Sequence, residues 1–435
     1  MSRVVAVLAT LDTKGAETQF LREEIEALGG RALLIDLGIV GKPTTAADVS
    51  ANEVLTAGGS SLSEILKKPS RQAAAPHITA GAQKILSQRV QAGEVHAVIG
   101  LGGTQGTSVC CQVMQCLPYG FPKLMLSTVA SGDTSPFIDI KDITMMFSVA
   151  DILGLNPLSR KMLSNAASAV WGMANNTRTL EPTKNTKGVI GMTNLGVLTD
   201  GAHHAIELFE KEGYEVITFH AVGAGGRAME QLVKEGAITA VFDYALGEIA
   251  DEVFGGLRAA NAERLTVAGK LGVPQVVCPG GAEHIGLLLD VPHEVPQAYR
   301  DHKYTFHSPK IFAPRLNSAE IRKVGLTICE RLRHSKSHVA FMLPTKGVSR
   351  YSVSGGELED RESDKALFDV LRASMPRQVS FQELELSAED PVFVETAVKT
   401  LIGLIRDKER MAAARPASKA AEISDLTQHD TISSN

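Results

Sequence analysis

The chain is poor in cysteine and has none of the cysteine spacings that mark a disulfide framework or a metal site. Its five cysteines are an odd number without any Cys-x-x-Cys pair, which argues against a secreted disulfide scaffold and a thiol redox motif. We expect reduced thiols that fill the hydrophobic core. They are Cys110, Cys111, Cys116, Cys278 and Cys329.

Long hydrophobic runs and basic stretches are also missing. The longest apolar segments, such as 6–9 and 339–343, have the length of a strand, and the N-terminus lacks a charged leader followed by an apolar core. The net charge is only −5 and no segment is rich in arginine, so no direct nucleic-acid partner is expected. We expect a cytoplasmic protein that has no membrane partner and binds small molecules.

Several well-known catalytic and nucleotide-binding motifs are absent. The Walker pattern Gly-x-x-x-x-Gly-Lys-Ser/Thr does not occur, nor do the nucleophile elbow Gly-x-Ser-x-Gly and the zinc motif His-Glu-x-x-His. These absences argue against P-loop chemistry, a hydrolase triad of the elbow type and a zinc peptidase.

What the sequence does contain is a regular alternation of strand-length apolar runs with segments of helical period. This is the βαβ pattern of mostly parallel sheets that helices cover on both faces. We therefore predict an α/β protein with two Rossmann-like three-layer domains and a ligand crevice between them. Strands are expected near 3–9, 31–37, 96–101, 122–127 and 143–148, and again near 188–192, 214–219, 238–243, 274–278 and 338–343.

A polar segment without periodicity, 175–187, separates the two halves. With 435 residues the chain is long enough for two hydrophobic cores. The predicted domains are a nucleotide-binding domain at 1–180 and a second domain at 186–410. Residues 411–435 have no core-forming pattern and are expected to form a flexible tail.

The most informative stretch is the turn at 100–108, which places four glycines and three hydroxyl residues between an apolar strand and an apolar helix. Glycine lets the main chain approach a ligand closely, and the N–H groups at the start of the helix point at negative charge. We expect this turn to hold phosphate. The alternative is a tight turn in which glycine only permits close helix packing.

A nicotinamide cofactor fits this turn less well. The turn does not match Gly-x-Gly-x-x-Gly in register, and the fingerprint normally lies in the first strand-to-helix turn. The strand at 122–127 also ends in serine, where a dinucleotide site needs an acidic residue to hold the ribose.

Two further polar turns, 10–14 and 127–133, follow other strands of the first half and should meet the glycine turn at the carboxyl edge of the sheet. They add hydroxyls, a lysine and carboxylates, which together can bind ATP with magnesium. Plain solvation is the alternative for Lys14, and helix capping is the alternative for Asp12. The predicted nucleotide-binding residues are Thr10, Asp12, Thr13, Lys14, Gly102, Gly103, Thr104, Gln105, Gly106, Thr107, Ser127, Thr128, Gly132 and Asp133.

The second half carries cations on glycine-bearing turns that can hold a second, anionic ligand. The candidates are Gly225, Gly226, Arg227, Lys346 and Arg350. The alternative is surface loops with ordinary salt bridges. The histidines fit no standard metal-ligand spacing and are expected to be structural or solvated, and we single out His284 and His307 among them for testing.

Five segments together resemble an uncharacterised protein family whose best-known relative is the tomato mosaic virus resistance protein of tomato. They are residues 100–108, 127–133, 151–156, 219–230 and 343–349, and the similarity runs in order over about 3–407. The resemblance implies two Rossmann-like domains, ATP binding in the N-terminal portion and a homodimer.

Two classes of function stay open. The leading hypothesis is an ATP-binding protein, either an enzyme or the partner of an enzyme, that acts on a small anionic metabolite at the interdomain crevice. The alternative is a non-catalytic, nucleotide-gated module that binds another protein, as the plant relative does when it inhibits viral RNA replication. An NAD(P)-dependent enzyme ranks third.

Overall fold

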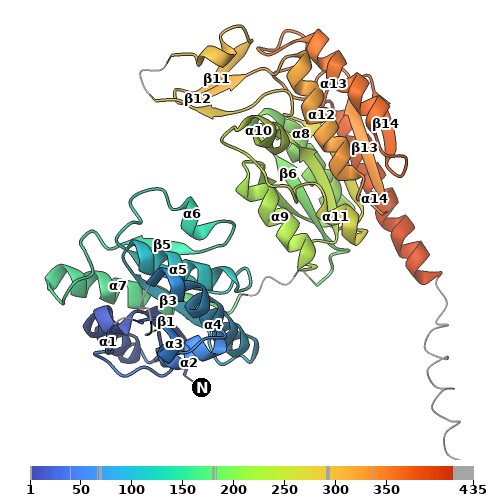
Figure 1. Ribbon diagram of the computed structural model, residues 1–435. Coiled ribbons are helices and arrows are strands. Elements are labelled where there is room, and N and C mark those ends of the chain that lie inside the picture. Colours follow the sequence, from blue (N-terminus) through green and yellow to red (C-terminus); the bar gives the residue numbers. More distant parts are fainter. Residues whose placement is uncertain are drawn as a thin grey trace, which may run out of the picture. The chain divides into compact units, whose positions relative to one another are not determined.

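The computed structural model describes residues 2–39, 41–65, 67, 71–178, 182, 184–290, 294–336 and 338–414 (Figure 1). The chain divides into two compact units, Met1–Glu181 and Pro182–Asn435. Each unit contains a parallel sheet covered by helices, so the predicted fold class is confirmed. No described helix is both long and apolar enough to cross a membrane.

The N-terminal unit is built on a five-stranded sheet with the order β2-β1-β3-β4-β5, in which every neighbouring pair is parallel. The strands are β1 (Val4–Ala9), β2 (Arg31–Asp36), β3 (Ala97–Gly102), β4 (Lys123–Ser127) and β5 (Thr144–Phe147). Successive side chains of a strand point to opposite faces. In β1, Val5 and Val7 therefore pack into one hydrophobic core, while Ala6 and Leu8 pack into another.

Helices cover both faces of this sheet and complete the three layers. The core that contains Val5 also contains residues of α1 (Leu11–Ala27) and α7 (Pro157–Ala174). The opposite core is covered by the remaining helices of the unit. They are α2 (Ala51–Ala57), α3 (Leu62–Ile65), α4 (Arg71–Gln91), α5 (Thr104–Gln115) and α6 (Ser135–Ile138).

The C-terminal unit contains a six-stranded sheet with the order β14-β13-β9-β8-β6-β7, again parallel throughout. In β13, Ala340 and Met342 face one core and Phe341 and Leu343 face the other. The strands are β6 (Val189–Asn194), β7 (Glu215–His220), β8 (Ala240–Ala245), β9 (Gln275–Gly280), β13 (Val339–Pro344) and β14 (Ser380–Leu384).

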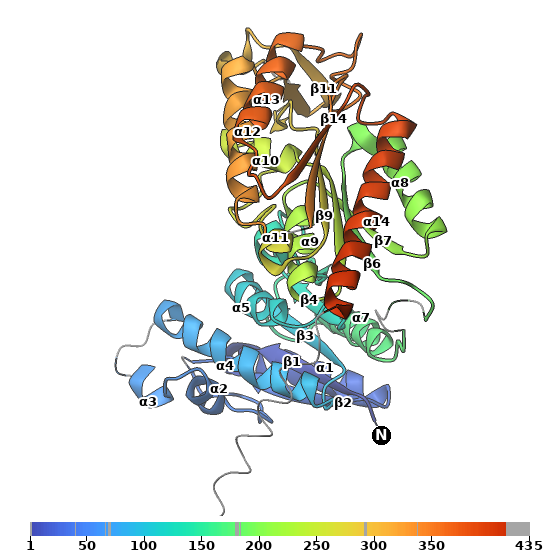
Figure 2. The same cartoon turned by 90° about the vertical axis from the view of Figure 1, so that its right-hand side faces the viewer.

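Two helices, α8 (Thr199–Lys211) and α14 (Pro391–Ala413), lie side by side on one face of this sheet (Figure 2). The other face carries α9 (Ala224–Lys234), α10 (Gly247–Phe254), α11 (Val267–Leu271), α12 (Ser318–Leu332) and α13 (Arg361–Ser374). Short 3-10 helices, η1 (Gly196–Leu198) and η2 (Gln297–Tyr299), complete the helical elements. Residues 415–435, most of the predicted tail, lie outside the described residues.

A small antiparallel sheet interrupts the alternation in the C-terminal unit. It has the order β10-β12-β11 and consists of β10 (Leu287–Leu288), β11 (Tyr304–Ser308) and β12 (Ile311–Pro314). The pairing of β11 with β12 shifts register between Phe306 and Ser308. The extra residue at this β-bulge is His307.

Candidate functional site

A cavity of about 450 Å³ opens at the carboxyl edge of the five-stranded sheet. Residues that follow β1, β2 and β3 form most of its lining, together with side chains of α4 and α5. The strand order reverses at β1, because β2 lies on one side of β1 and β3 lies on the other side. Doubly wound folds with the strand order 2-1-3-4-5 bind ligands at this switch point, and the volume is in the range of small-molecule sites.

The glycine turn forms one wall of the cavity, because α5 begins there. Gly103 precedes the helix in an extended conformation, and no side chain caps this helix end. The first intrahelical bond runs from the Thr107 N–H to the Gly103 carbonyl at 2.8 Å. The N–H groups of residues 104–106 precede it, and a helix leaves such groups without partners in its own backbone. This end of α5 can therefore donate several hydrogen bonds to an anion in the cavity.

The glycines of this turn are required to different degrees. A Cβ on Gly102 would stand 3.0 Å from the Cα of Gly106, so the main chain packs tightly there. A Cβ on Gly103 would meet only Thr128 Oγ1, at 3.6 Å, which is an ordinary contact. Close packing of the main chain therefore explains why residue 102 is a glycine, which agrees with the packing alternative. It does not explain why residue 103 is a glycine.

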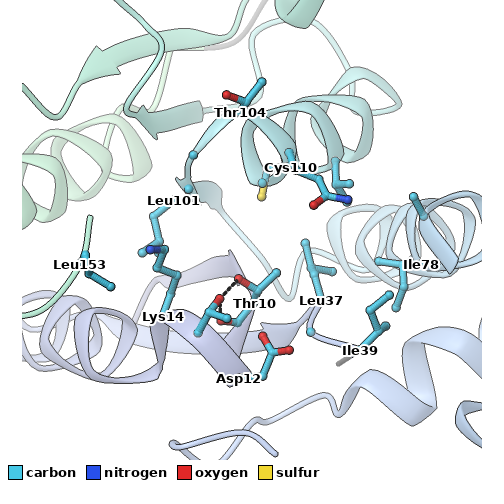
Figure 3. A pocket seen from close by; sticks show the side chains of 18 of the residues that line it. Thr10, Asp12, Lys14, Leu37, Ile39, Ile78, Leu101, Thr104, Cys110 and Leu153 are labelled. Carbon is cyan, nitrogen blue, oxygen red and sulfur yellow. Dashed lines mark hydrogen bonds between the residues drawn. The ribbon is translucent and has the colours of Figure 1, made fainter. Parts of the chain in front are cut away.

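The turn after β1 supplies polar groups to the same cavity (Figure 3). The hydroxyls of Thr10 and Thr13 lie 2.8 Å apart. Lys14 departs from helical geometry, with φ −126° and ψ 21°, and its half-buried ammonium donates to the carbonyl of Ile152. Asp12 accepts a hydrogen bond from the N–H of Gly41 through Oδ2, at 3.0 Å. Lys14 is therefore held at the cavity wall instead of extending into solvent.

The opposite side of the cavity is apolar. Its lining includes Leu37 and Ile39 after β2, Ile78 of α4 and Val109 of α5, and Figure 3 shows Leu37, Ile39 and Ile78 on one side of the opening. These residues were not among those predicted from the sequence. The rule that chain segments after parallel strands line the site could have found 37–39, because they follow β2 as the glycine turn follows β3.

A buried carboxylate holds together the turn that follows β1 and the turn that follows β2. Asp36, at the end of β2, accepts hydrogen bonds from the N–H groups of Leu11 at 3.0 Å and Gly38 at 2.8 Å. Burial raises the pKa of Asp36, while these two N–H groups oppose the increase. In a dinucleotide fold an acidic residue in this position binds the ribose, but here the carboxylate binds its own main chain.

The remaining predicted nucleotide-binding residues do not line the cavity; they are Thr107, Ser127, Thr128, Gly132 and Asp133. Thr107 and Ser127 are buried and join their hydroxyls at 2.7 Å, which ties α5 to the end of β4. The exposed carboxylate of Asp133 accepts from the N–H and the hydroxyl of Ser135 at the start of α6. A nucleotide contact by this group of residues stays a prediction.

The cavity holds no activated thiol. Cys110 lines it, but burial raises the pKa of this thiol well above its usual range, so it stays protonated and is a poor nucleophile. Cys111, Cys278 and Cys329 are buried as expected, whereas Cys116 is exposed. The core-filling role predicted for all the cysteines is therefore wrong for Cys116, which lies just after the last residue of α5, outside the core.

The second glycine turn, Gly223–Gly226, carries an anion from its own chain. The N–H groups of Gly223 and Gly226 donate to Glu248 Oε1 at 2.6 and 3.1 Å. A Cβ on Gly226 would stand 2.0 Å from Glu248 Oε2, and one on Gly225 would stand 1.9 Å from the carbonyl of His220. These glycines therefore make room for internal contacts. Arg227 follows them in the first turn of α9 and is half-buried.

The other two second-ligand candidates form exposed ion pairs. Lys346 lies 3.7 Å from Glu385. Arg350 pairs with Glu389 at 3.0 Å and with Asp200 at 3.1 Å. These contacts match the alternative of ordinary surface salt bridges, and a ligand-binding role for Lys346 and Arg350 stays a prediction.

A buried carboxyl in the C-terminal unit predicts how stability depends on pH. Burial raises the pKa of Glu230 to about 7, Asp243 adds to this effect and Arg264 opposes it. The folded chain then keeps a proton that the unfolded chain loses near pH ~4.3. The contribution of Glu230 to stability should decline as pH rises from about 4.5 to about 7 and then level off. Asp364, whose pKa burial raises to about 6, acts in the same direction.

Urea unfolding of the full chain between about pH 5 and pH 8, followed by far-ultraviolet circular dichroism, measures this slope. We expect Glu230→Gln to flatten it, because the variant cannot take up the proton. Equal slopes in both proteins would show that Glu230 does not titrate in this range.

Two family models match this chain. Residues 3–179 match the N-terminal domain, and residues 187–405 the C-terminal domain, of an uncharacterised protein family (UPF0261). A UPF0261 protein of Clostridium tetani (strain Massachusetts / E88) is 38% identical over 406 residues, which cover 93% of this chain and 100% of the relative. A UPF0261 protein of Rhizobium meliloti (strain 1021) is 35% identical over 396 residues, which cover 91% of this chain and 97% of the relative.

A plant relative and a solved structure are more distant. The ToMV resistance protein Tm-1 of Solanum lycopersicum is 33% identical over 342 residues, which cover 77% of this chain and 45% of the plant protein. The crystal structure of the UDP-GlcNAc 2-epimerase from Neisseria meningitidis is 12% identical, with a TM-score of 0.22 over 63% of this chain and 82% of that chain. A score this low supports no argument about function.

Proposed function

The chain belongs to the uncharacterised protein family UPF0261, and we propose that its N-terminal unit binds ATP in the cavity at the ends of β1, β2 and β3. One observation carries the proposal. An uncapped helix end, at Gly103 and Thr104, and an apolar wall, at Ile39 and Ile78, line opposite parts of one cavity. A nucleotide has the same division, because its phosphates need N–H donors and its base needs an apolar surface.

The charged groups of the lining suit a triphosphate with magnesium. Lys14 brings an ammonium with three donors, only one of which is needed for the Ile152 carbonyl. Asp12 and the exposed Asp151 are the carboxylates of the lining. Magnesium keeps several waters and is usually held by one or two carboxylates plus substrate phosphates. Asp12 and Asp151 would hold the ion, which would neutralise charge on the phosphates.

A dinucleotide is a weaker candidate for this cavity. The carboxylate that would hold its ribose, Asp36, is 3% exposed and bonds to the main chain at Leu11 and Gly38. A flavin mononucleotide must be tested as well, because the same strand order and switch point bind this cofactor in other proteins.

A ligand screen tests the proposal on the full chain. The only tryptophan, Trp171, lies on α7 in the N-terminal unit, so its fluorescence reports the unfolding of that unit. ATP with magnesium should stabilise this transition by about 2.7 kcal/mol at 100 times its dissociation constant. Stabilisation by NAD, NADP or FMN without any effect of ATP would refute the proposal.

We further propose that the bound nucleotide serves a reaction on a small anionic metabolite. Release of ADP, AMP or phosphate in the presence of such a metabolite would support an enzyme. Binding without turnover across a panel of metabolites would favour the nucleotide-gated binding module instead.

A further inference from the structure

A second cavity, of about 130 Å³, lies within the C-terminal unit. Segments that follow β6, β7, β9 and β13 meet there with the antiparallel sheet. Apolar side chains form much of its wall, and Val197 and Leu257 are examples. The polar side chains of the lining are His220, Arg258, His284, His307 and Tyr351. Among the described residues no aspartate or glutamate lines this cavity, so no carboxylate of the lining competes with an anion for its N–H and O–H donors.

Arg258 is held rigidly at this cavity by an internal carboxylate. Its Nε and one Nη bond to the two oxygens of Asp251 at 3.0 and 2.8 Å. The same Nη donates to the His284 carbonyl at 3.0 Å, and the other Nη lies 3.3 Å from His284 Nε2. The guanidinium has five N–H donors, and these contacts use four of them. The fifth has no partner among the described residues.

His284 is oriented by the residue before it. Its Nδ1 lies 3.1 Å from Glu283 Oε1. Burial alone would raise the pKa of Glu283, but His284, Arg315 and the Ser349 hydroxyl outweigh it and hold that pKa at about 2. The Glu283 carboxylate is therefore ionised and accepts a hydrogen bond from Nδ1 of His284, whose Nε2 faces Arg258. The two carboxylates beside the cavity are therefore bonded within the protein, Asp251 to Arg258 and Glu283 to His284.

His307 reaches the cavity because of the β-bulge. The extra residue of a bulge re-aims its side chain and bends the strand, and bulges are frequent beside functional sites. His307 Nδ1 lies 3.3 Å from the hydroxyl of Tyr351, and the Tyr351 ring stands edge-on to His284 with the centroids 5.6 Å apart. Three separate parts of the chain are therefore joined around this cavity, while His307 and His220 stay exposed.

We propose that this cavity binds a small oxyanion carried on a short apolar body, held by Arg258, His220 and His307. Three imidazoles and a guanidinium converge without a carboxylate in the lining. Metal binding does not explain them, because no group of three or more potential ligands among the described residues is placed to hold an ion. The cavity volume of about 130 Å³ and the apolar walls fit a molecule of a few carbons with one carboxylate or phosphate group.

Residues of the C-terminal unit line this cavity, whereas residues of the N-terminal unit line the proposed nucleotide cavity. The idea that this cavity holds the metabolite of the proposed reaction rests on the proposed function. Oxyanion binding by the cavity does not depend on it, because ATP binding is measured separately through Trp171 fluorescence.

A matched pair of glycine variants tests the site. A Cβ on Gly196 would meet only His307 Cε1, at 3.5 Å, so Gly196→Leu extends a side chain beside His307 without a clash at its base. Gly403, exposed on α14, has nothing within 4 Å, and Gly403→Leu is the control. Histidine resonances of the full chain, labelled with carbon-13 at Cε1, are followed while sodium butyrate or sodium phosphate is added.

We expect saturable shifts of the His220 and His307 signals, assigned with the His220→Gln and His307→Gln variants. The dissociation constant should rise at least about 10-fold in Gly196→Leu, as for the loss of one charged hydrogen bond, and stay unchanged in Gly403→Leu. A response to butyrate assigns a carboxylate ligand and a response to phosphate a phosphate ligand. No saturable shift with either anion, or equal shifts in Gly196→Leu, would overturn the proposal.

Discussion

Replacing Gly103 with valine is expected to lower the affinity for ATP by at least about 100-fold while the chain stays folded. The branched side chain would stand over the N–H groups at the start of α5 and displace phosphate, and each charged hydrogen bond lost costs about 1.5–3 kcal/mol. The fold should tolerate the change, because the added Cβ meets only Thr128 Oγ1 at 3.6 Å. Valine also accepts the extended backbone found at Gly103, with φ −79° and ψ −165°.

Isothermal titration calorimetry measures this effect, with Gly172→Val as the matched control. Gly172 is exposed on α7 in the same unit, and a Cβ there has nothing within 4 Å. The control should bind ATP as the unaltered chain does. Equal affinities for all three proteins would remove the glycine turn from the binding site.

Replacing Arg264 with methionine is expected to destabilise the C-terminal unit by about 3–5 kcal/mol, because it leaves buried carboxylates without their cation. Arg264 is fully buried and bonds to both oxygens of Asp243 at 2.6 Å and to Glu248 at 2.7 Å. Glu230 lies 3.5 Å from the same guanidinium. Methionine can fill most of the space, but it supplies no charge and no donor.

The two units permit an internal control for this variant. Far-ultraviolet circular dichroism should show an earlier urea transition, whereas Trp171 fluorescence in the N-terminal unit should keep its midpoint. Arg333→Met is the matched substitution, since Arg333 forms an exposed pair with Glu330 and such pairs contribute about 0–1 kcal/mol. A loss of stability no larger than that of Arg333→Met would show that the buried cluster does not depend on Arg264.

The sequence was sufficient to predict the five strands of the first parallel sheet, five of the six strands of the second and the glycine turn of the cavity, but not the edge strand β14. Strand-length apolar runs mark buried parallel strands, and the topology of such sheets brings the following turns to one edge. Residues 102–106, 10 and 12–14 could therefore be predicted to line one cavity, and they do. The same reasoning does not reveal that the hydroxyls of Thr107 and Ser127 bond to each other inside the protein. Spacing does not reveal which way a side chain points.

The second glycine turn shows a further limit of sequence patterns. Gly223–Gly226 has the composition of an anion site, and it does bind an anion, but the anion is Glu248 of the same chain. The sequence does not show what the folded chain brings to each helix end. The antiparallel strands between Leu287 and Pro314 were not predicted either, since they are only two to five residues long.

The most direct test of the nucleotide site is a crystal structure of the full chain with magnesium and a non-hydrolysable ATP analogue. We predict phosphate oxygens within about 2.7–3.2 Å of the backbone nitrogens of residues 104–106, with the base against Ile39 and Ile78. An analogue bound elsewhere at full occupancy, or no binding at saturating concentration, would contradict this prediction.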